Sequence, residues 1–231
     1  MPETQPFILT LSGPPGSGTT TLAKRLEAHY DLFRVTGGDI FRSMAAEQNM
    51  SEQEFGKHVN KNPKLDREID ERLYAMIQTA AGTTPEETEH PSAALNAQNQ
   101  LRDANGLLVE SRLAGWLASD HANFRLWCDA PIEVRANRIQ TDRTNRKTET
   151  LDELRTREND EAARYDNFYG ININDSSIYD LVINTARWSP DTIFEMVTTG
   201  INQHNADTDE GQVSSRDPIK DTTLNDATIV E

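Results

Sequence analysis

The segment Gly13–Thr20, GPPGSGTT, has the residue types and spacing of a loop that binds phosphate. Glycines let the backbone curl around an anion, so that N–H groups at the start of the next helix point at it. The segment follows the pattern G-x-x-x-x-G-K-[ST] except that Thr19 stands at the Lys position. Thr20 keeps the hydroxyl that binds Mg²⁺ in such loops. Either another cation replaces the lysine, or the site binds nucleotide without efficient catalysis.

Two further segments combine an arginine with a carboxylate just after an expected strand. The sequence TGGDIFR contains Asp39 and ends at Arg42, and the sequence ESR runs from Glu110 to Arg112. A guanidinium donates paired hydrogen bonds, which suits it to grip a phosphate group. A carboxylate at the end of a strand can hold Mg²⁺ through water. These segments are therefore candidates for binding an acceptor phosphate and a metal ion.

Arg157, Glu161 and Arg164 form a third charged group, within an expected long helix. Their spacing of four and three residues places them on one helical face. Such a face could grip an anionic substrate, or it could be a solvated surface of salt bridges. The sequence leaves both interpretations open.

A basic cluster precedes that helix and stands out against a net charge of −15. Its members are Arg135, Arg138, Arg143, Arg146 and Lys147. A basic lid that closes over a nucleotide brings cations to the transferred phosphoryl group and excludes water. We expect Arg138 to replace the missing lysine, although any single base here could instead be an exposed surface residue.

Short apolar runs alternate with helical patterns along the chain, which predicts an α/β fold. We expect strands at 7–11, 33–35, 107–109, 124–128 and 181–183. We expect helices at 20–30, 39–48, 65–77, 132–140 and 151–169, and a last helix that begins near Pro190. The predicted fold is that of a P-loop NTPase: a five-stranded parallel sheet flanked by helices, with a small helical acceptor-binding region and a lid at 139–157.

Two segments lack the pattern of a packed core. Residues 79–105 contain no aromatic residue, and we expect a flexible insertion there, with a short helix around 93–101. Residues 202–231 are acidic and also lack aromatics, so we expect a disordered tail. The predicted domain therefore spans residues 1–201.

The composition argues against several classes of partner. The chain has 38 acidic residues against 23 basic ones, and this surplus repels nucleic acid and anionic membranes. Its single cysteine, Cys128, cannot form a disulfide within the chain. No apolar run approaches the length of a membrane span. We expect a cytoplasmic monomer that binds small molecules.

The chain resembles the archaeal (type 2) cytidylate kinase family over residues 7–200. Besides the phosphate loop, the resemblance is carried by VTGGDIFR, VESRLAGW, WCDAPIEVRANRI, RENDEAARY and SSIYDLVINTARW. VESRLAGW and SSIYDLVINTARW are fairly specific, whereas the loop alone would not be. The resemblance implies a kinase that moves the γ-phosphate of ATP, with Mg²⁺, onto CMP or dCMP. Glu161 departs from a similar R-x-x-x-D-x-x-R arrangement in the bacterial cytidylate kinases.

The resemblance also implies a role for each candidate residue. The expected ATP-binding residues are Gly13, Pro14, Pro15, Gly16, Ser17, Gly18, Thr19, Thr20 and Thr21. The expected CMP-binding residues are Asp39, Arg42, Arg112 and Glu161. Thr20 and Glu110 would hold Mg²⁺, and Arg138, Arg157 and Arg164 would neutralise charge during in-line transfer. Two rivals stay open: a kinase for another small acceptor such as UMP or AMP, and a nucleotide-binding regulator that lost catalysis with its lysine.

The acid surplus leads to a prediction about salt. It indicates either adaptation to concentrated salt or an ordinary acidic protein. We predict that activity rises as KCl is added, because counterions screen the self-repulsion of a folded chain with a net charge of −15. Turnover is measured across a KCl series, and circular dichroism reports folding at each point. Loss of activity at moderate KCl in a chain that stays folded would contradict the prediction.

Overall fold

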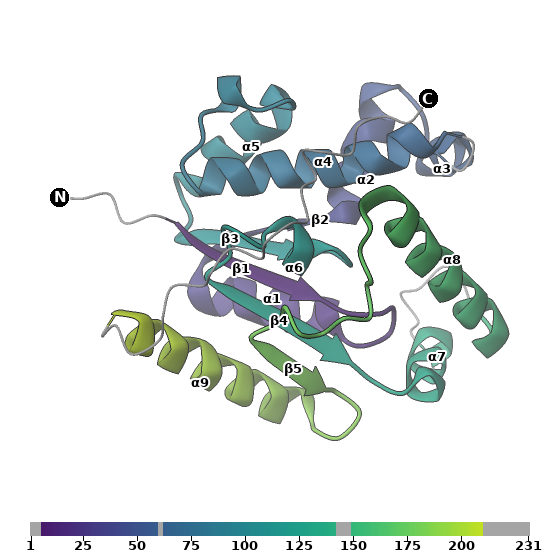
Figure 1. The fold of residues 1–231 in the computed structure, drawn as a ribbon, viewed down its shortest axis with the longest axis vertical. Coiled ribbons are helices and arrows are strands. Elements are labelled where there is room, and N and C mark those ends of the chain that lie inside the picture. Colours follow the sequence, from purple (N-terminus) through teal and green to yellow (C-terminus); the bar gives the residue numbers. More distant parts are fainter. Residues whose placement is uncertain (1–5, 60–61, 142–148, 210–231) are drawn as a thin grey trace. The chain divides into compact units, whose positions relative to one another are not determined.

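Five parallel strands form one sheet in the computed structural model, in the order β2-β3-β1-β4-β5 (Figure 1). The strands are β1 (Phe7–Ser12), β2 (Leu32–Thr36), β3 (Gly106–Glu110), β4 (Phe124–Asp129) and β5 (Leu181–Asn184). Each contains one predicted strand, so the expected α/β fold with a five-stranded parallel sheet is confirmed. The structure describes residues 6–59, 62–141 and 149–209.

Helices connect the strands and account for most of the remaining described chain. They are α1 (Thr19–Tyr30), α2 (Gly37–Glu47), α3 (Glu52–Val59), α4 (Pro63–Ala80), η1 (Pro85–Glu87), α5 (Pro91–Leu101), α6 (Ala114–Leu117), α7 (Ile132–Thr141), α8 (Leu151–Tyr169) and α9 (Pro190–Asp209). Sequence patterns miss α3 and α6. Both are short, and α3 buries only Phe55 and Val59, which is too few positions to show a helical period.

The chain divides into two units. Unit 1 comprises Met1–Ser12 and Ala23–Arg125, and unit 2 comprises Gly13–Leu22 and Leu126–Glu231. The phosphate loop therefore belongs to unit 2. The segments TGGDIFR and ESR belong to unit 1.

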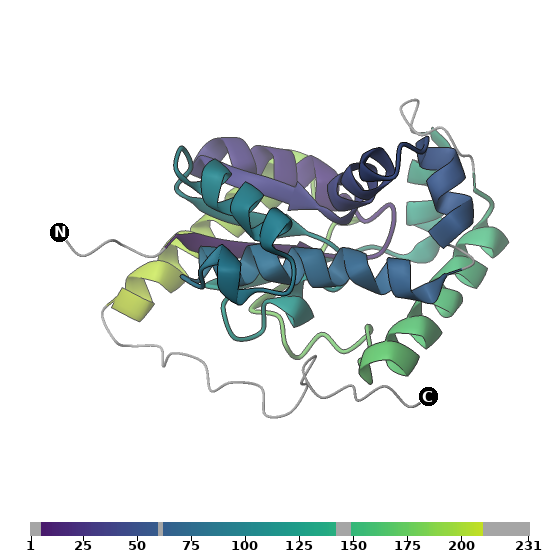
Figure 2. The same cartoon turned by 90° about the horizontal axis from the view of Figure 1, so that it is seen from above.

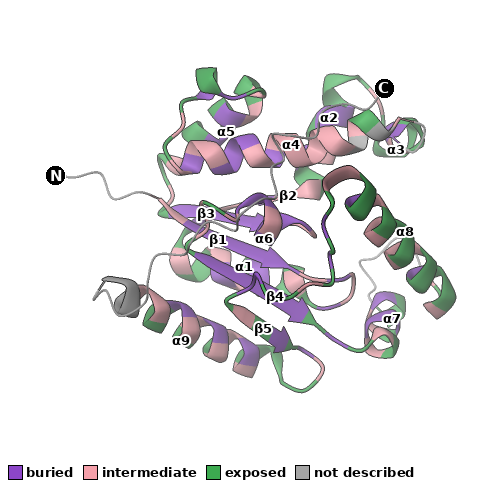
Figure 3. Ribbon diagram, in the orientation of Figure 1, coloured by how far each residue is buried: buried purple, intermediate pink, exposed green. Residues whose placement is uncertain are grey.

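In unit 1, the carboxyl ends of neighbouring strands are aligned. β3 pairs with both β1 and β2, and Glu110 lies opposite Leu11 on one side and Thr36 on the other. Leu107, Leu108 and Val109 have no exposed surface, so β3 is buried on both faces (Figure 3). Consecutive apolar residues of this kind are typical of a parallel strand covered by helices. This core places Thr36 and Glu110 at one edge of the sheet.

Residues 79–105, predicted to be a flexible insertion, contain η1 and α5 instead. Helix α5 packs along α4 (Figure 2), and Ala94 and Ala97 are fully buried. Their spacing of three residues lets two helices approach closely, because alanine adds little bulk. A stripe of two alanines among polar residues is too weak a signal to distinguish a packed helix from a loop. The predicted short helix is confirmed and begins two residues earlier, at Pro91.

In unit 2, β4 pairs with β5, and α9 packs on β5. Helix α7 packs on α8 through Ala136, Ile139 and Leu154. The capping box of Thr150 and Glu153 starts α8, and Gly170 ends it with a φ of 64°. These contacts fix α8 against α7 in the unit that carries the phosphate loop.

The predicted start of the tail at residue 202 needs correction, and parts of the predicted tail and lid lie outside the described residues. Helix α9 continues to Asp209, so the chain stays helical past residue 201, where the predicted tail begins. The polar residues after Ile201 show no apolar period, which hid this extension. Residues 210–231 of the predicted tail and 142–148 of the predicted lid lie outside the described residues.

Ile201 tests whether this part of α9 belongs to the folded domain. Its side chain has no exposed surface, so Ile201→Ala should lower the free energy of unfolding by about 2–4 kcal/mol through lost burial and a residual cavity. Thr199→Ala, at an exposed position of the same helix, is the matched control and should change stability by less than about 0.5 kcal/mol. Urea denaturation measures both. Equal effects would show that this end of α9 adds nothing to the core.

Candidate active site

The phosphate loop joins β1 to α1, as predicted, and its backbone depends on glycine. Gly16 and Gly18 have positive φ angles of 78° and 95°. A residue with a Cβ atom adopts such angles only at a cost. At Gly16 a Cβ would also lie 2.7 Å from the backbone oxygen of Arg135, which is closer than real contacts allow. Glycine at position 16 therefore lets the loop and the first turn of α7 touch.

The carbonyl oxygens of residues 15–17 each accept a hydrogen bond from a side chain of unit 2. Arg135 Nη1 donates to the first at 3.1 Å, and Arg138 Nη1 donates to the second at 3.2 Å. Thr185 Oγ1 donates to the third at 2.6 Å. The loop is thus held along its carbonyl side by α7 and by the segment after β5.

Arg135 is buried and links the loop to two other segments. Its Nε donates to the carbonyl of Ala130 at 2.8 Å, and its two terminal nitrogens donate to the carboxylate of Glu158 on α8. Only 6% of Arg135 is exposed. A buried charge of this kind needs both an opposite charge and full hydrogen bonding, and this arrangement supplies them.

Arg138, predicted to be catalytic, lies on the carbonyl side of the loop. Besides Gly16, it donates to Thr185 twice, from Nη1 to Oγ1 and from Nη2 to the backbone oxygen, each at 2.9 Å. Its guanidinium is therefore engaged with the loop and its support in this structure. Whether it contacts the transferred phosphoryl group stays a prediction.

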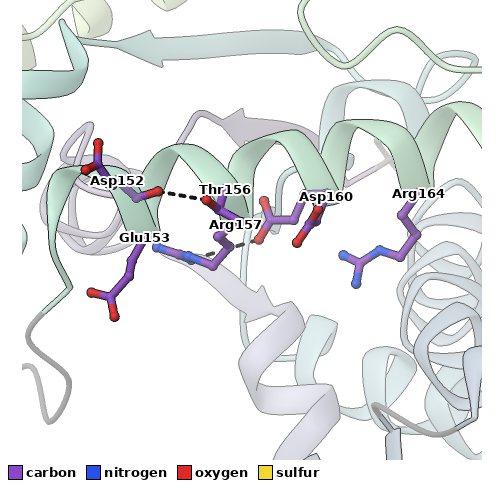
Figure 4. Close-up of a pocket in the computed structure, with 7 residues that line it drawn as sticks. Asp152, Glu153, Thr156, Arg157, Asp160 and Arg164 are labelled. Atoms are coloured by element: carbon purple, nitrogen blue, oxygen red, sulfur yellow. Dashed lines mark hydrogen bonds and ion pairs between the residues drawn. The ribbon is translucent and has the colours of Figure 1, made fainter.

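A pocket lies along one face of α8 (Figure 4). It is lined by Asp152, Glu153, Thr156, Arg157, Asp160, Glu161 and Arg164. The predicted trio of Arg157, Glu161 and Arg164 therefore shares one face, as expected from its spacing. Arg157 is paired with Glu149 at 2.9 and 2.6 Å and lies 3.9 Å from Glu161. An anionic substrate would have to compete with these carboxylates for Arg157.

In unit 1, the start of α2 is built by Thr36 and Asp39. Thr36 Oγ1 accepts from the backbone N–H of Asp39 at 3.0 Å, and the Asp39 carboxylate accepts from the Thr36 N–H at 2.9 Å. This reciprocal capping box starts the helix. Asp39 also accepts from Arg42 Nη2 at 2.5 Å, so the cap orients the exposed arginine.

These contacts shift the acidity of Asp39. Partial burial raises the pKa of its carboxyl, but the hydrogen bonds from Thr36 and Arg42 outweigh that effect, and the pKa lies below its usual range. Asp39 is therefore ionised at neutral pH. It acts first as a helix cap and as a partner of Arg42, and direct contact with CMP stays a prediction.

Glu110, at the end of β3, is held by an arginine that the sequence analysis missed. Arg34 on β2 donates to Glu110 from Nη1 at 2.9 Å and to Glu27 from Nε at 2.7 Å. Burial alone would lower the pKa of Arg34, but the two carboxylates raise it above its usual value. Arg112 follows β3 in the same unit and is partly buried. Arg34 lies opposite Leu108 in register, a strand position that reads as structural in sequence alone.

The donor set suits magnesium better than a metal bound wholly by protein. Among the described residues, no group of three or more His, Cys, Asp or Glu side chains could hold an ion. Mg²⁺ usually takes one or two protein oxygens and completes its shell with substrate phosphates and water. The Thr20 hydroxyl and the Glu110 carboxylate are oxygen ligands of that kind. They belong to different units, so their sharing of one ion stays a prediction.

Comparison with known proteins places this chain in a family. The model of the cytidylate kinase-like family matches residues 8–187. The chain belongs to the cytidylate kinase-like family. A cytidylate kinase of Haloquadratum walsbyi is 40% identical over 216 residues, which cover 93% of this chain and all of that protein. A cytidylate kinase of Pyrococcus horikoshii is 40% identical over 196 residues, 85% of this chain and 88% of that protein.

The solved structures add evidence about the fold alone. An uncharacterised protein from Eubacterium ventriosum superposes with a TM-score of 0.52 at 18% identity, and the match covers 85% of this chain and 98% of that one. This similarity agrees with the α/β architecture of the present chain. It carries no information about substrate.

The structure adds residues to the predicted site and leaves others untested. Arg135 was predicted only as one base of the cluster, and Thr185 only as part of a family segment, yet both contact the loop. Backbone carbonyls are invisible in a sequence, so their side-chain partners could not be recognised there. Glu161 and Arg164 belong to unit 2, whereas Arg42 and Arg112 belong to unit 1. The cluster members Arg143, Arg146 and Lys147 lie outside the described residues.

The capping box at α2 predicts a pH-dependent contribution to stability. Asp39→Asn should lower the free energy of unfolding at pH 7 by about 0.5–1 kcal/mol, the usual scale of a helix cap. Because the folded pKa is depressed, this contribution is complete above the unfolded pKa of about 3.9 and is lost as pH falls through the folded value. Urea denaturation at several pH values measures it, with exposed Asp103→Asn as the control. A difference that persists unchanged at low pH would refute the assignment.

Proposed function

We propose that the protein is a cytidylate kinase, which transfers the γ-phosphate of ATP to CMP and releases CDP and ADP. The supporting observation is the glycine-dependent phosphate loop in a chain that is 40% identical, over 93% of its length, to a cytidylate kinase. The ESR and TGGDIFR segments give the chain a set of arginines suited to an acceptor phosphate. The same residues would serve dCMP.

The donor nucleotide would be held by the loop. Backbone N–H groups at Gly16, Gly18 and Thr19 lie where the chain turns into α1, and such groups bind phosphate oxygens well. Thr20 and Thr21 are exposed on the first turn of α1 and add hydroxyls. The positive end of the helix dipole favours the anion further.

The acceptor nucleotide would be gripped by arginines. Arg42 is 53% exposed and is oriented by Asp39, so it can reach a phosphate in solution without leaving a buried partner. Arg112 follows Glu110 by two residues at the end of β3. Planar guanidinium groups bind two oxygens of one phosphate, which fixes its direction of attack. The carboxylate of Glu161, on one face of α8, would accept a hydrogen bond from CMP.

Mg²⁺ bound by Thr20 and Glu110 would neutralise charge on the donor phosphates. The protein's own part is positioning and electrostatic stabilisation. A phosphate oxygen of CMP bonds to the γ-phosphorus, the bond from that phosphorus to the bridging oxygen breaks, and ADP leaves with the electron pair. Arg138, Arg157 and Arg164 would offset the negative charge that develops, and no covalent enzyme intermediate is needed.

Both substrates carry negatively charged phosphate groups, which explains why a strongly acidic chain needs these local cations. With a net charge of −15, the long-range field repels ATP and CMP. Contacts at close range must therefore supply the attraction, and paired arginine contacts are the strongest available.

We also propose a cytoplasmic location and a monomeric state. The described residues contain no helix long and apolar enough to cross a membrane.

A coupled assay of ADP release tests the proposed function. With ATP and Mg²⁺, we predict faster turnover with CMP than with AMP, UMP or GMP. Arg42→Gln should raise the KM for CMP at least about tenfold, the scale of one lost charged hydrogen bond, while the KM for ATP stays nearly constant. Arg102→Gln, at an exposed arginine that ends α5 and lies outside the proposed site, is the control. An equal or faster rate with AMP would reject CMP as the preferred acceptor, and binding of ATP without any turnover would favour a regulator.

A further inference from the structure

The phosphate loop lacks its usual lysine, yet two arginines contact it on the carbonyl side. Arg135 and Arg138 bind the carbonyls of residues 15 and 16, and Thr185 binds the next one. These contacts come from α7 and from the segment after β5, neither of which belongs to the loop motif. The phosphate-loop motif itself therefore does not account for these three contacts.

A contact that fixes a loop carbonyl also fixes the N–H group of the same peptide unit, which points away on the other side of the loop. The carbonyl of residue 15 and the N–H of Gly16 belong to one planar peptide unit and point in opposite directions. A donor that fixes the carbonyl on one side therefore fixes the N–H on the other. The same holds for the carbonyl of residue 17 and the N–H of Gly18. Donation to a carbonyl also polarises its peptide, which strengthens the N–H as a donor.

The middle contact has a different consequence. The N–H of Ser17 donates to the carbonyl of Pro14 at 3.1 Å, inside the loop. Arg138 binds the other end of that peptide at Gly16. It thus stabilises the tight turn from Pro14 to Ser17, whose closing N–H lies between the N–H groups of Gly16 and Gly18 along the loop.

The two arginines differ in the charge that they bring. The charge of Arg135 is offset by Glu158, whose carboxylate it binds with both terminal nitrogens. The three acceptors that Arg138 binds are two backbone carbonyls and a hydroxyl, which are neutral. Within residues 6–59, 62–141 and 149–209, these acceptors do not offset its positive charge, which would lie one peptide unit away from a phosphate bound at the N–H groups of the loop. Coulomb attraction over such a distance is substantial where water is partly excluded.

We infer that Arg135, Arg138 and Thr185 are positioning residues of the phosphate loop, and that Arg138 supplies through the loop part of the positive charge that Thr19 cannot. The inference rests on the proposed function, since it takes the donor to be ATP. Arg135 fixes the conformation of the loop, because it ties the loop to Glu158 on α8. Arg138 fixes the conformation of the loop and also contributes positive charge.

Binding of ADP to the full-length protein, measured by calorimetry without CMP, tests the role of Arg138. Arg138→Met should weaken ADP binding at least about tenfold, the scale of lost charged hydrogen bonds. Arg138→Lys keeps the charge and one donor, and should recover part of that loss. Arg102→Met, which removes an exposed arginine at the end of α5, should leave the affinity unchanged.

Arg135 needs a paired change, because losing it alone would leave the partly buried Glu158 carboxylate without its partner. The double variant Arg135→Met, Glu158→Gln removes both charges together. We expect weaker ADP binding here too, with a raised KM for ATP and an unchanged KM for CMP. Thr19→Lys in the Arg138→Met background should restore part of the ADP affinity, because it returns a cation to the loop.

The outcomes separate the inference from the proposed function. Unchanged ADP affinity in folded Arg138→Met and in the folded double variant would overturn the inference. Equal increases in the KM for ATP and CMP, together with a fall in melting temperature, would also overturn it, since they indicate a purely structural role. If the wild-type protein fails to phosphorylate CMP while ADP affinity falls as expected, the inference stands and the proposed acceptor is wrong.

Discussion

The close approach of α7 to the phosphate loop at Gly16 is the constraint on which the donor site depends. A side chain at Gly16 would collide with the backbone of Arg135, so the approach exists only because this position is glycine. At that distance, Arg135 and Arg138 reach the loop carbonyls with hydrogen bonds of 3.1 and 3.2 Å. The conformation of the loop is therefore set by tertiary contacts as well as by its own glycines. Helix α8 joins the same arrangement through Glu158.

Among the described residues, three arginines of the candidate site or its surroundings are paired with carboxylates. Asp39 caps α2 and orients Arg42, Arg34 spans Glu27 and Glu110, and Arg157 is held by Glu149. In a protein with a net charge of −15, unpaired arginines would be drawn to any carboxylate nearby. The carboxylate partners hold these three guanidinium groups in place. In the proposed function, substrate binding would exchange one set of charged hydrogen bonds for another, which would limit affinity but maintain selectivity.

The sheet, the phosphate loop and the shared face of Arg157, Glu161 and Arg164 could be predicted because each leaves a regular trace in sequence. Consecutive apolar residues mark β3, and fixed spacing marks the loop and the α8 face. The short helix α5 could be predicted, but its packing on α4 and the extension of α9 could not, because two buried alanines and a polar final stretch carry almost no periodic signal. The supports of the loop were hidden for another reason. Thr185 and Arg135 bind backbone carbonyls, and only the folded chain shows which carbonyls lie within their reach.

The most direct test of this account is a crystal structure of the protein with ADP bound. The account predicts that the β-phosphate accepts hydrogen bonds from the N–H groups of Gly16 and Gly18, while Arg138 still donates to the carbonyl of Gly16. The phosphate would then lie on one side of the loop and the arginine on the other. A structure in which Arg138 has left Gly16 and contacts the β-phosphate directly would contradict it, because the arginine would then replace the missing lysine from the front.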